Sequence, residues 1–376
     1  MRKISIENLG PIDGKFEISL DQNLTILIGE QATGKSTIAR MLYYCTILAT
    51  NERMTQSGSE DYFRIPHIDT LRQYFRRTYS SGDVLFFDDS LGLSVSVAGE
   101  YSTKRISTSD LSDERRGTIY IPAGRSTIPL LFESYAAVKN INVDPFFDDF
   151  LLFLDGHRRE YHVSLQDMLT DNVEFSESQI DIKNAKAAIG LIEKILKGKY
   201  RYEKGNERIF YGNDVSVPIV AASSGQQEIL YILMTLYYVL LHPKPYTVII
   251  EEPEAHIFPM AQKLIMELVA RVINATDSHI VITTHSPYIL TSANLLMHSA
   301  KVENRVNDTN SIVEPMERLR PEEVSAFLLE RNGDFSYRSI VDSDTGLIAA
   351  EEIDKVSEII DKGIADLIDL EVKHGL

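Results

Sequence analysis

The sequence is poor in the residues that several classes of protein need. It has 376 residues with one cysteine, Cys45, and no tryptophan. A single cysteine excludes an intrachain disulfide and a zinc site built from several thiolates, and it fits a reducing cytoplasm. No signal peptide precedes the first strand-like run, and the longest nearly unbroken apolar stretch, residues 229–241, is too short to span a bilayer. We therefore expect a cytoplasmic protein without a membrane partner.

Positive charge is also scarce. The chain has 38 Lys+Arg against 55 Asp+Glu, a formal net charge of −17. Because attraction to nucleic-acid phosphates needs clustered positive charge, this balance does not indicate a nucleic-acid partner. The most basic segment, residues 194–208, interleaves lysine and arginine with Tyr200 and Tyr202. A nucleic-acid contact is one interpretation of that segment, and a solvated helix end followed by a hairpin is the favoured one.

The hydrophobic pattern predicts alternating strands and helices. Apolar runs at residues 24–28, 118–121, 246–250 and 279–283 are typical of buried strands, and helical spacing occupies residues 36–48, 226–241 and 259–274. This alternation predicts an α/β fold with a parallel sheet covered by helices. Runs at residues 3–7 and 15–20 indicate a β-rich start. Residues 126–199 are predicted to be mainly helical, 200–220 to form a hairpin region and 349–376 an acidic helix.

A glycine-rich loop lies between the first buried strand and the first helix. Residues 29–36 read GEQATGKS, a full match to the phosphate-loop pattern, and the strand before and helix after argue against a chance match. Backbone amides of such a loop surround nucleotide phosphates, and the helix directs the positive end of its dipole at them. Lys35 is expected to reach the β- and γ-phosphates, and the Ser36 hydroxyl to bind Mg²⁺. The predicted nucleotide-binding residues of the loop are Gly29, Glu30, Gln31, Ala32, Thr33, Gly34, Lys35, Ser36 and Thr37.

Two carboxylates, Glu251 and Glu252, follow directly on the strand at 246–250. Open α/β sheets bind ligands in the loops at the carboxyl ends of their parallel strands. Glu251 is placed to hold Mg²⁺ through water, and Glu252 to orient and deprotonate an attacking water. A solvated acidic turn is the alternative, but it does not explain why two charges follow immediately on a buried strand.

Two further segments carry weaker signals. Small residues and a serine N-cap precede the helix at 226–241, an arrangement that can bind anions but taken alone indicates only a capped helix. His285 follows the strand at 279–283 within the string THSP, where a lone histidine is usually structural. Arg125, in the string YIPAGRS, is interpreted equally well as a phosphate or interface contact and as a surface arginine.

Together, the phosphate loop, SSGQQ, EEPE and THSP occur in one recognisable order. That order resembles an ABC-type ATPase head of the soluble branch that includes SMC/RecF-like and OLD-like (overcoming-lysogenization-defect) ATPases. The strings IEEPEAHIFP and ITTHSPYIL are particularly similar to the OLD-like and AAA_15/AAA_21 ATPases. The resemblance covers the first fifty residues and about 210–295, with a weaker similarity at 120–126.

The resemblance implies a P-loop NTPase fold and a nucleotide-sandwich dimer, in which the signature segment of one copy completes the site of the other. Glu252 would be the general base and His285 the switch histidine that senses the γ-phosphate. ATP and Mg²⁺ are the implied cofactors. The signature residues expected to contact the nucleotide of the partner copy are Ser223, Ser224, Gly225 and Gln226.

On this interpretation the chain divides into four parts. They are the first part of the ATPase head at 1–125, a mainly helical insertion at 126–205, the second part of the head at 206–300 and a C-terminal extension at 301–376. The pair Asp342 and Asp344 resembles the DxD of a TOPRIM nuclease, but too few residues follow it for such a domain. We therefore do not expect a built-in nuclease.

The leading functional prediction is an ATP-hydrolysing switch that forms a dimer or higher oligomer. It would control a separate effector, such as a nuclease, in anti-phage defence. The alternatives are a RecF-type DNA-repair ATPase that binds DNA directly, a transporter motor subunit and a non-catalytic ATP-gated scaffold.

Overall fold

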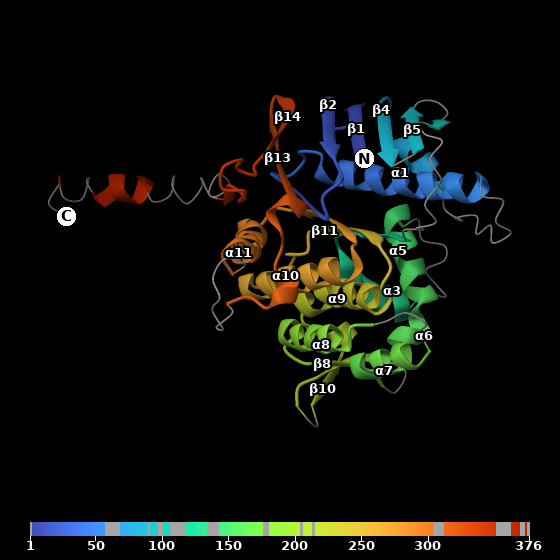
Figure 1. Ribbon diagram of the computed structural model, residues 1–376, viewed down its shortest axis with the longest axis vertical. Helices are drawn as coiled ribbons and strands as arrows, with labels where there is room; N and C mark the ends of the chain where they lie inside the picture. The colour runs from blue at the N-terminus through green and yellow to red at the C-terminus, as the bar shows by residue number, and fades with distance from the viewer. Residues whose placement is uncertain are drawn as a thin grey trace.

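A six-stranded sheet lies at the centre of the molecule (Figure 1). The computed structural model describes residues 2–56, 68–88, 91–96, 101–105, 117–133, 143–175, 180–203, 206–212, 215–303, 312–350, 362–368 and 373. In spatial order the strands of the sheet are β14 (Asp334–Ser339), β13 (Val324–Asn332), β3 (Leu24–Gly29), β12 (His279–Thr284), β11 (Tyr246–Glu251) and β7 (Gly117–Ile121).

Every neighbouring pair in this sheet is parallel except β13 and β14. Strands β3, β11 and β12 are buried at every residue, as strands covered by other layers on both faces must be. The predicted α/β fold with a parallel sheet is therefore confirmed.

A second sheet covers one side of the molecule above α1 (Lys35–Gln56) (Figure 1). All strand pairs of this second sheet are antiparallel. One cluster of buried side chains joins this sheet, α1 and the central sheet, so α1 lies between the two sheets. Cys45 is fully buried there, and burial raises the pKa of its thiol. The predicted β-rich start is confirmed by strands β2 (Ile12–Ser19), β1 (Arg2–Leu9), β4 (Asp83–Asp88), β5 (Leu91–Ser96) and β6 (Tyr101–Arg105).

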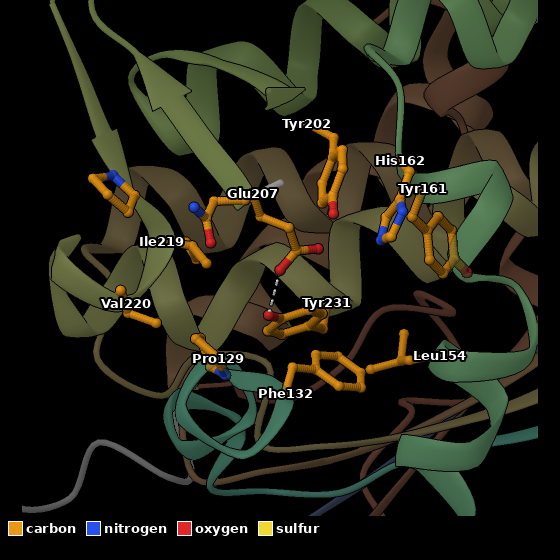
Figure 2. A pocket seen from close by; sticks show the side chains of 12 residues that line it. Pro129, Phe132, Leu154, Tyr161, His162, Tyr202, Glu207, Ile219, Val220 and Tyr231 are labelled. Carbon is orange, nitrogen blue, oxygen red and sulfur yellow. Dashed lines mark hydrogen bonds between the residues drawn. The ribbon is translucent and has the colours of Figure 1, made fainter. Parts of the chain in front are cut away.

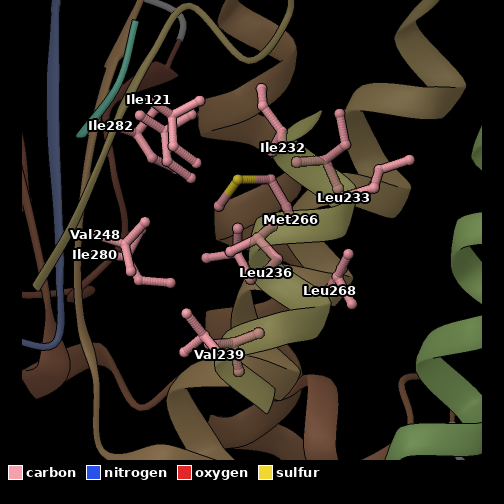
Figure 3. Packing of buried hydrophobic residues seen from close by; sticks show 14 of the residues in the cluster. Ile121, Ile232, Leu233, Leu236, Val239, Val248, Met266, Leu268, Ile280 and Ile282 are labelled. Carbon is pink, nitrogen blue, oxygen red and sulfur yellow. The ribbon is translucent and has the colours of Figure 1, made fainter. Parts of the chain in front are cut away.

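Helices pack on the other face of the central sheet. Helix α9 (Ser224–Leu241) is buried at every residue from Glu228 onward, which is typical of a helix that is apolar all round. Helices α10 (Pro259–Thr276) and α8 (Ile182–Leu196) pack beside it, and α11 (Pro287–Glu303) packs against α10. Figure 3 shows Ile232 and Leu236 of α9 and Met266 of α10 packed against Val248 and Ile282 of the sheet.

The segment predicted to be mainly helical contains five helices in its described part, and a three-stranded sheet follows it. The helices are α3 (Ile128–Glu133), α5 (Pro145–Gly156), α6 (Arg158–Tyr161), α7 (Leu165–Phe175) and α8. The predicted hairpin region forms β8 (Lys199–Glu203), β9 (Asn206–Phe210) and β10 (Ser216–Pro218), and residues 204–205 and 213–214 lie outside the described residues. Of the helices in the described ranges, none combines the length and apolar character that crossing a bilayer requires.

Residues 301–376, predicted as an extension, supply two strands of the central sheet. Strand β13 pairs in parallel with β3 from Leu24 to Gly29, next to the glycine-rich loop. Val324, Ala326 and Leu328 are buried at a period of two, the pattern by which this strand could have been found. Of the predicted acidic helix, residues 362–368 are helical, and 351–361, 369–372 and 374–376 lie outside the described residues.

Candidate functional site

Four parallel strands of the central sheet end at the same edge. The glycine-rich loop follows β3, and His285 follows β12. Glu251 is the last residue of β11 and Glu252 comes directly after it, while Arg125 lies four residues beyond β7. Because β12 lies between β3 and β11, the sheet brings the predicted histidine between the loop and the carboxylates.

The loop is held tightly against β13. A Cβ atom at Gly29 would lie 2.2 Å from the carbonyl oxygen of Leu329, so a side chain at this position would collide with the backbone of β13. Gly34 has φ +98°, a conformation that side chains rarely adopt. Ala32 is in the left-handed region at φ 62°. Close approach and backbone conformation together explain why the loop needs glycine at both positions.

Lys35 lies inside the loop, only 5% exposed. Its Nζ donates to the carbonyl oxygens of Gly29 at 2.7 Å and Glu30 at 2.6 Å. Burial lowers the pKa of Lys35 to about 8, while the negative charges of Glu252 and Glu254 oppose that shift. The ammonium group is thus desolvated and within electrostatic reach of the carboxylates after β11.

Glu251 has the chemistry of a magnesium ligand. The residue is 3% exposed, its Oε2 accepts from the amide of Ala123 at 3.4 Å, and its Oε1 has no hydrogen-bond partner among the described residues. A buried carboxylate oxygen without a partner is a position that a cation or its bound water can fill. Ser36 is exposed at the start of α1. The described residues hold no cluster of three or more His, Cys, Asp or Glu suited to a metal.

Glu252 is held in an uncommon backbone conformation. Its φ of 45° lies in the left-handed region, which costs a non-glycine residue about 1 kcal/mol or more. Its amide donates to the Thr283 carbonyl at 2.9 Å, and its carbonyl accepts from Arg125 Nη2 at 2.9 Å. Its carboxylate Oε1 lies 3.2 Å from His285 Nε2, and both side chains are about one-third exposed. The turn therefore presents the Glu252–His285 pair at the open edge of the sheet.

Glu254 is a site residue to which the sequence analysis assigned no role. Its Oε1 accepts from the Thr284 hydroxyl at 2.8 Å and from the His285 amide at 2.6 Å. The last carboxylate of EEPE thereby ties the segment that carries His285 to the turn after β11. The sequence could have indicated a role for Glu254, because it is the third carboxylate of the string EEPE.

Arg125 is neither a phosphate contact nor a surface arginine, so both interpretations of it were wrong. It is completely buried, and its guanidinium donates to the carbonyl oxygens of Glu228 at 3.0 Å, Glu251 at 2.7 Å and Glu252. The Glu228 carboxylate accepts in turn from the amides of Arg125 at 3.0 Å and Ser126 at 3.1 Å. Since Glu228 is the one charged residue of the otherwise uncharged helix α9, it was the signal that could have revealed this contact.

The signature segment lies on the helix that Arg125 holds. Ser223 caps α9 and forms a reciprocal capping box with Gln226. A Cβ atom at Gly225 would lie 2.5 Å from the carbonyl oxygen of His256, so this segment packs against the turn after Glu252. Gln226 also bonds to Tyr211 and Leu196, and within the described residues none of the predicted signature residues Ser223, Ser224, Gly225 and Gln226 is hydrogen-bonded to the phosphate loop.

A family model described as AAA ATPase domain (AAA_15) matches residues 1–75 and 124–290 of the chain. Among solved structures, the chain is similar to the SMC head bound to the C-winged helix domain of ScpA, at 12% identity and a TM-score of 0.48, over 91% of this chain and 98% of that one. It is also similar to the SMC head domain from Thermotoga maritima, at 11% identity and a TM-score of 0.43, over 90% of this chain and 98% of that one. No curated protein matches the sequence.

Proposed function

This chain belongs to the AAA_15 family of AAA ATPase domains, and from that membership we propose that it binds ATP with Mg²⁺ and hydrolyses it between two copies of itself. The observation that carries the proposal is the Glu252–His285 pair, 3.2 Å apart at the strand ends that also hold the buried Lys35. A general base must be oriented before it can take a proton from water. The backbone contacts of Glu252 on both sides supply that orientation.

Each group at the sheet edge has a separate role in the proposed reaction. The loop amides and Lys35 bind the phosphates, with phosphate oxygens taking the place of the Gly29 and Glu30 carbonyls at Nζ. Glu252 accepts the proton of the attacking water, and His285 orients that carboxylate and senses the γ-phosphate. Ser36, and Glu251 through water, would hold Mg²⁺, which when bound would supply positive charge to the phosphate oxygens.

A second copy of the chain is proposed to complete each site. The signature residues make no hydrogen bond to the phosphate loop of their own chain among the described residues, and the capping box of Ser223 and Gln226 holds the start of α9 in a fixed conformation. This start of α9 is the part that would contact the nucleotide of another copy. Large apolar side chains flank the site and are well exposed: Phe258 at 80%, Met260 at 57% and Tyr288 at 51%. The segments that carry them are joined by a 2.6 Å bond between Ser286 and Gln262. A partner copy would bury this apolar surface.

ATP binding would close the dimer and hydrolysis would release it, a population shift driven by different affinities for the two states. We propose that this switch controls a separate effector, such as a nuclease, in anti-phage defence. The Asp342 carboxylate accepts from the amides of Asp344 and Thr345 within one turn, which agrees with the expectation that this pair is not a built-in nuclease site.

The alternative of direct DNA binding is disfavoured by the net charge of −17, and Arg208 of residues 194–208 donates to Ser216. Lys197, Lys199 and Arg201 of that segment are exposed, so they are the residues that test this alternative.

The substitution Glu252→Gln tests the proposal. We expect the variant to bind ATP as tightly as the native chain, to hydrolyse it about 10²–10⁴-fold more slowly and to remain dimeric with ATP in light scattering. The exposed Glu314→Gln is the matched control and should change neither property. Unchanged or faster hydrolysis by Glu252→Gln would refute its role as the base, and a monomer under saturating ATP would refute the dimer.

A further inference from the structure

A cavity of about 410 Å³ lies outside the predicted nucleotide site. Its walls come from α3, α5, α6, α9, the three-stranded sheet and the short helix η2 (Ile219–Ala221). A volume of this size is in the range of small-molecule sites. We propose that the cavity binds the cationic head of an organic ligand, such as an ammonium, amidinium or guanidinium group.

The carboxylate of Glu207 lines the cavity and is the group that would contact the cation. Figure 2 shows it projecting between Tyr202 and Tyr231, with the Tyr231 hydroxyl donating to Oε2 at 2.8 Å. The Tyr200 hydroxyl lies 3.2 Å from Oε1, but its one proton has a closer acceptor in the Tyr161 carbonyl at 2.8 Å. The Tyr231 phenol of α9 therefore orients the carboxylate at the cavity wall.

Aromatic rings form much of the remaining wall. The rings of His162 and Tyr202 are stacked with centroids 3.7 Å apart, and Phe132 and Tyr231 meet edge to face at 6.2 Å. The faces of such rings attract organic cations, and an aromatic cage beside a carboxylate is a well-suited binder of ammonium groups.

The charge of the lining decides the sign of the ligand. Among the described residues that line the cavity there is one carboxylate, that of Glu207, one imidazole, that of His162, and no lysine or arginine. With the imidazole neutral, the carboxylate is the charge of the described lining, and it would repel a phosphate or carboxylate ligand. The same cationic chemistry can come from a free metabolite or from a methylated lysine of a peptide, and the two sources can be distinguished by experiment.

Occupancy of the cavity would act on the signature helix, an inference that rests on the proposed function. Ile219 and Val220 line the cavity just before Ser223, and their carbonyls accept from Gln227 of α9 at 3.0 and 2.9 Å. Tyr231, also on α9, lines the cavity as well. A bound cation thus contacts two parts of the chain that set the position of Ser223.

Benzamidine, benzamide and benzoate test the binding, because they share one shape and differ in charge. By calorimetry without nucleotide, we expect benzamidine to bind and the neutral and anionic analogues to bind at least about tenfold more weakly. Equal affinity for the three probes, or preference for benzoate, would overturn the proposal with the native chain alone.

Glu207→Gln should weaken benzamidine about tenfold or more, while the matched Glu203→Gln, an exposed carboxylate of β8, should not. Equal loss in both variants would contradict a specific site. Benzamidine should still bind to Lys35→Ala, which separates this cavity from the nucleotide site. A short peptide with trimethyllysine that binds more tightly than free tetramethylammonium assigns the cation to a peptide, and the reverse order assigns it to a metabolite.

In hydrolysis assays, benzamidine should change the turnover of the native chain and leave that of Glu207→Gln unchanged. Binding without any change in turnover would overturn the link to the signature helix. Absence of ATP hydrolysis in the native chain would instead contradict the proposed function, and the calorimetric result would still decide the cavity.

Discussion

Carboxylates occur in two regions of this molecule with opposite partners. At the sheet edge, Glu251 and Glu252 lie beside the buried cations Lys35 and Arg125. At the cavity, Glu207 has the phenols of Tyr200 and Tyr231 around it, and the described lining holds no lysine or arginine. The comparison teaches that neighbouring cations, more than the carboxylates themselves, decide which ligand a site suits. On the two proposals above, the edge would bind a triphosphate with a metal, whereas the cavity would bind an organic cation.

The largest effect is expected when a buried cation is removed from the sheet edge by mutation. Arg125→Met removes the guanidinium from beside the buried Glu228 carboxylate, which keeps only its two backbone amide donors, and it removes the donor to the carbonyls of Glu251 and Glu252. We expect the free energy of unfolding to fall by about 3–5 kcal/mol, measured by urea denaturation.

Arg331→Met is the control for this prediction. Arg331 pairs with Asp13 at 3.7 Å, and both side chains are about 40% exposed. An exposed pair contributes about 0–1 kcal/mol. If the two variants lose equal stability, Arg125 is not the buried centre of the sheet edge that its contacts indicate.

Raising the pH removes a cation from the same edge without a mutation. The lowered pKa of Lys35, about 8, means that the free chain loses this charge above pH 8, and a bound triphosphate would raise that pKa again. ATP affinity should therefore fall about tenfold between pH 7 and pH 9. Equilibrium binding of a fluorescent ATP analogue measures this. Lys35→Arg keeps its charge and should show a flat profile, so a flat profile in the native chain would contradict the titration of Lys35.

The smallest expected effect concerns how a carboxylate positions its neighbours. Glu254→Gln keeps an oxygen that can accept from Thr284 and the His285 amide but removes the charge from both bonds. We expect turnover to fall about two- to fivefold with ATP affinity unchanged, since a charged hydrogen bond is replaced by a neutral one. Steady-state kinetics separates the two quantities. A loss of ATP affinity without a loss of turnover would place Glu254 at the phosphates instead of at His285.

The hydrophobic pattern of short sequence windows predicted the strands and helices whose formation depends on neighbouring residues in the chain. The apolar runs at 24–28, 246–250 and 279–283 became β3, β11 and β12, because a strand covered on both faces must be apolar throughout. Because parallel strands end at the same edge of a sheet, the phosphate loop, EEPE and THSP, which follow these strands, lie at one edge. The sequence alone also predicted the capped start of α9.

Only the tertiary structure decided which distant segments complete these local units. Gly29 meets Leu329 of a strand that the sequence analysis did not predict, and Arg125 reaches Glu251 across 126 positions of the chain. The cavity takes its walls from segments between Pro129 and Tyr231. A window of sequence carries the periodicity and backbone preferences of its own residues. It does not specify which carbonyl a buried arginine meets, because that partner is chosen by the packing of the whole chain.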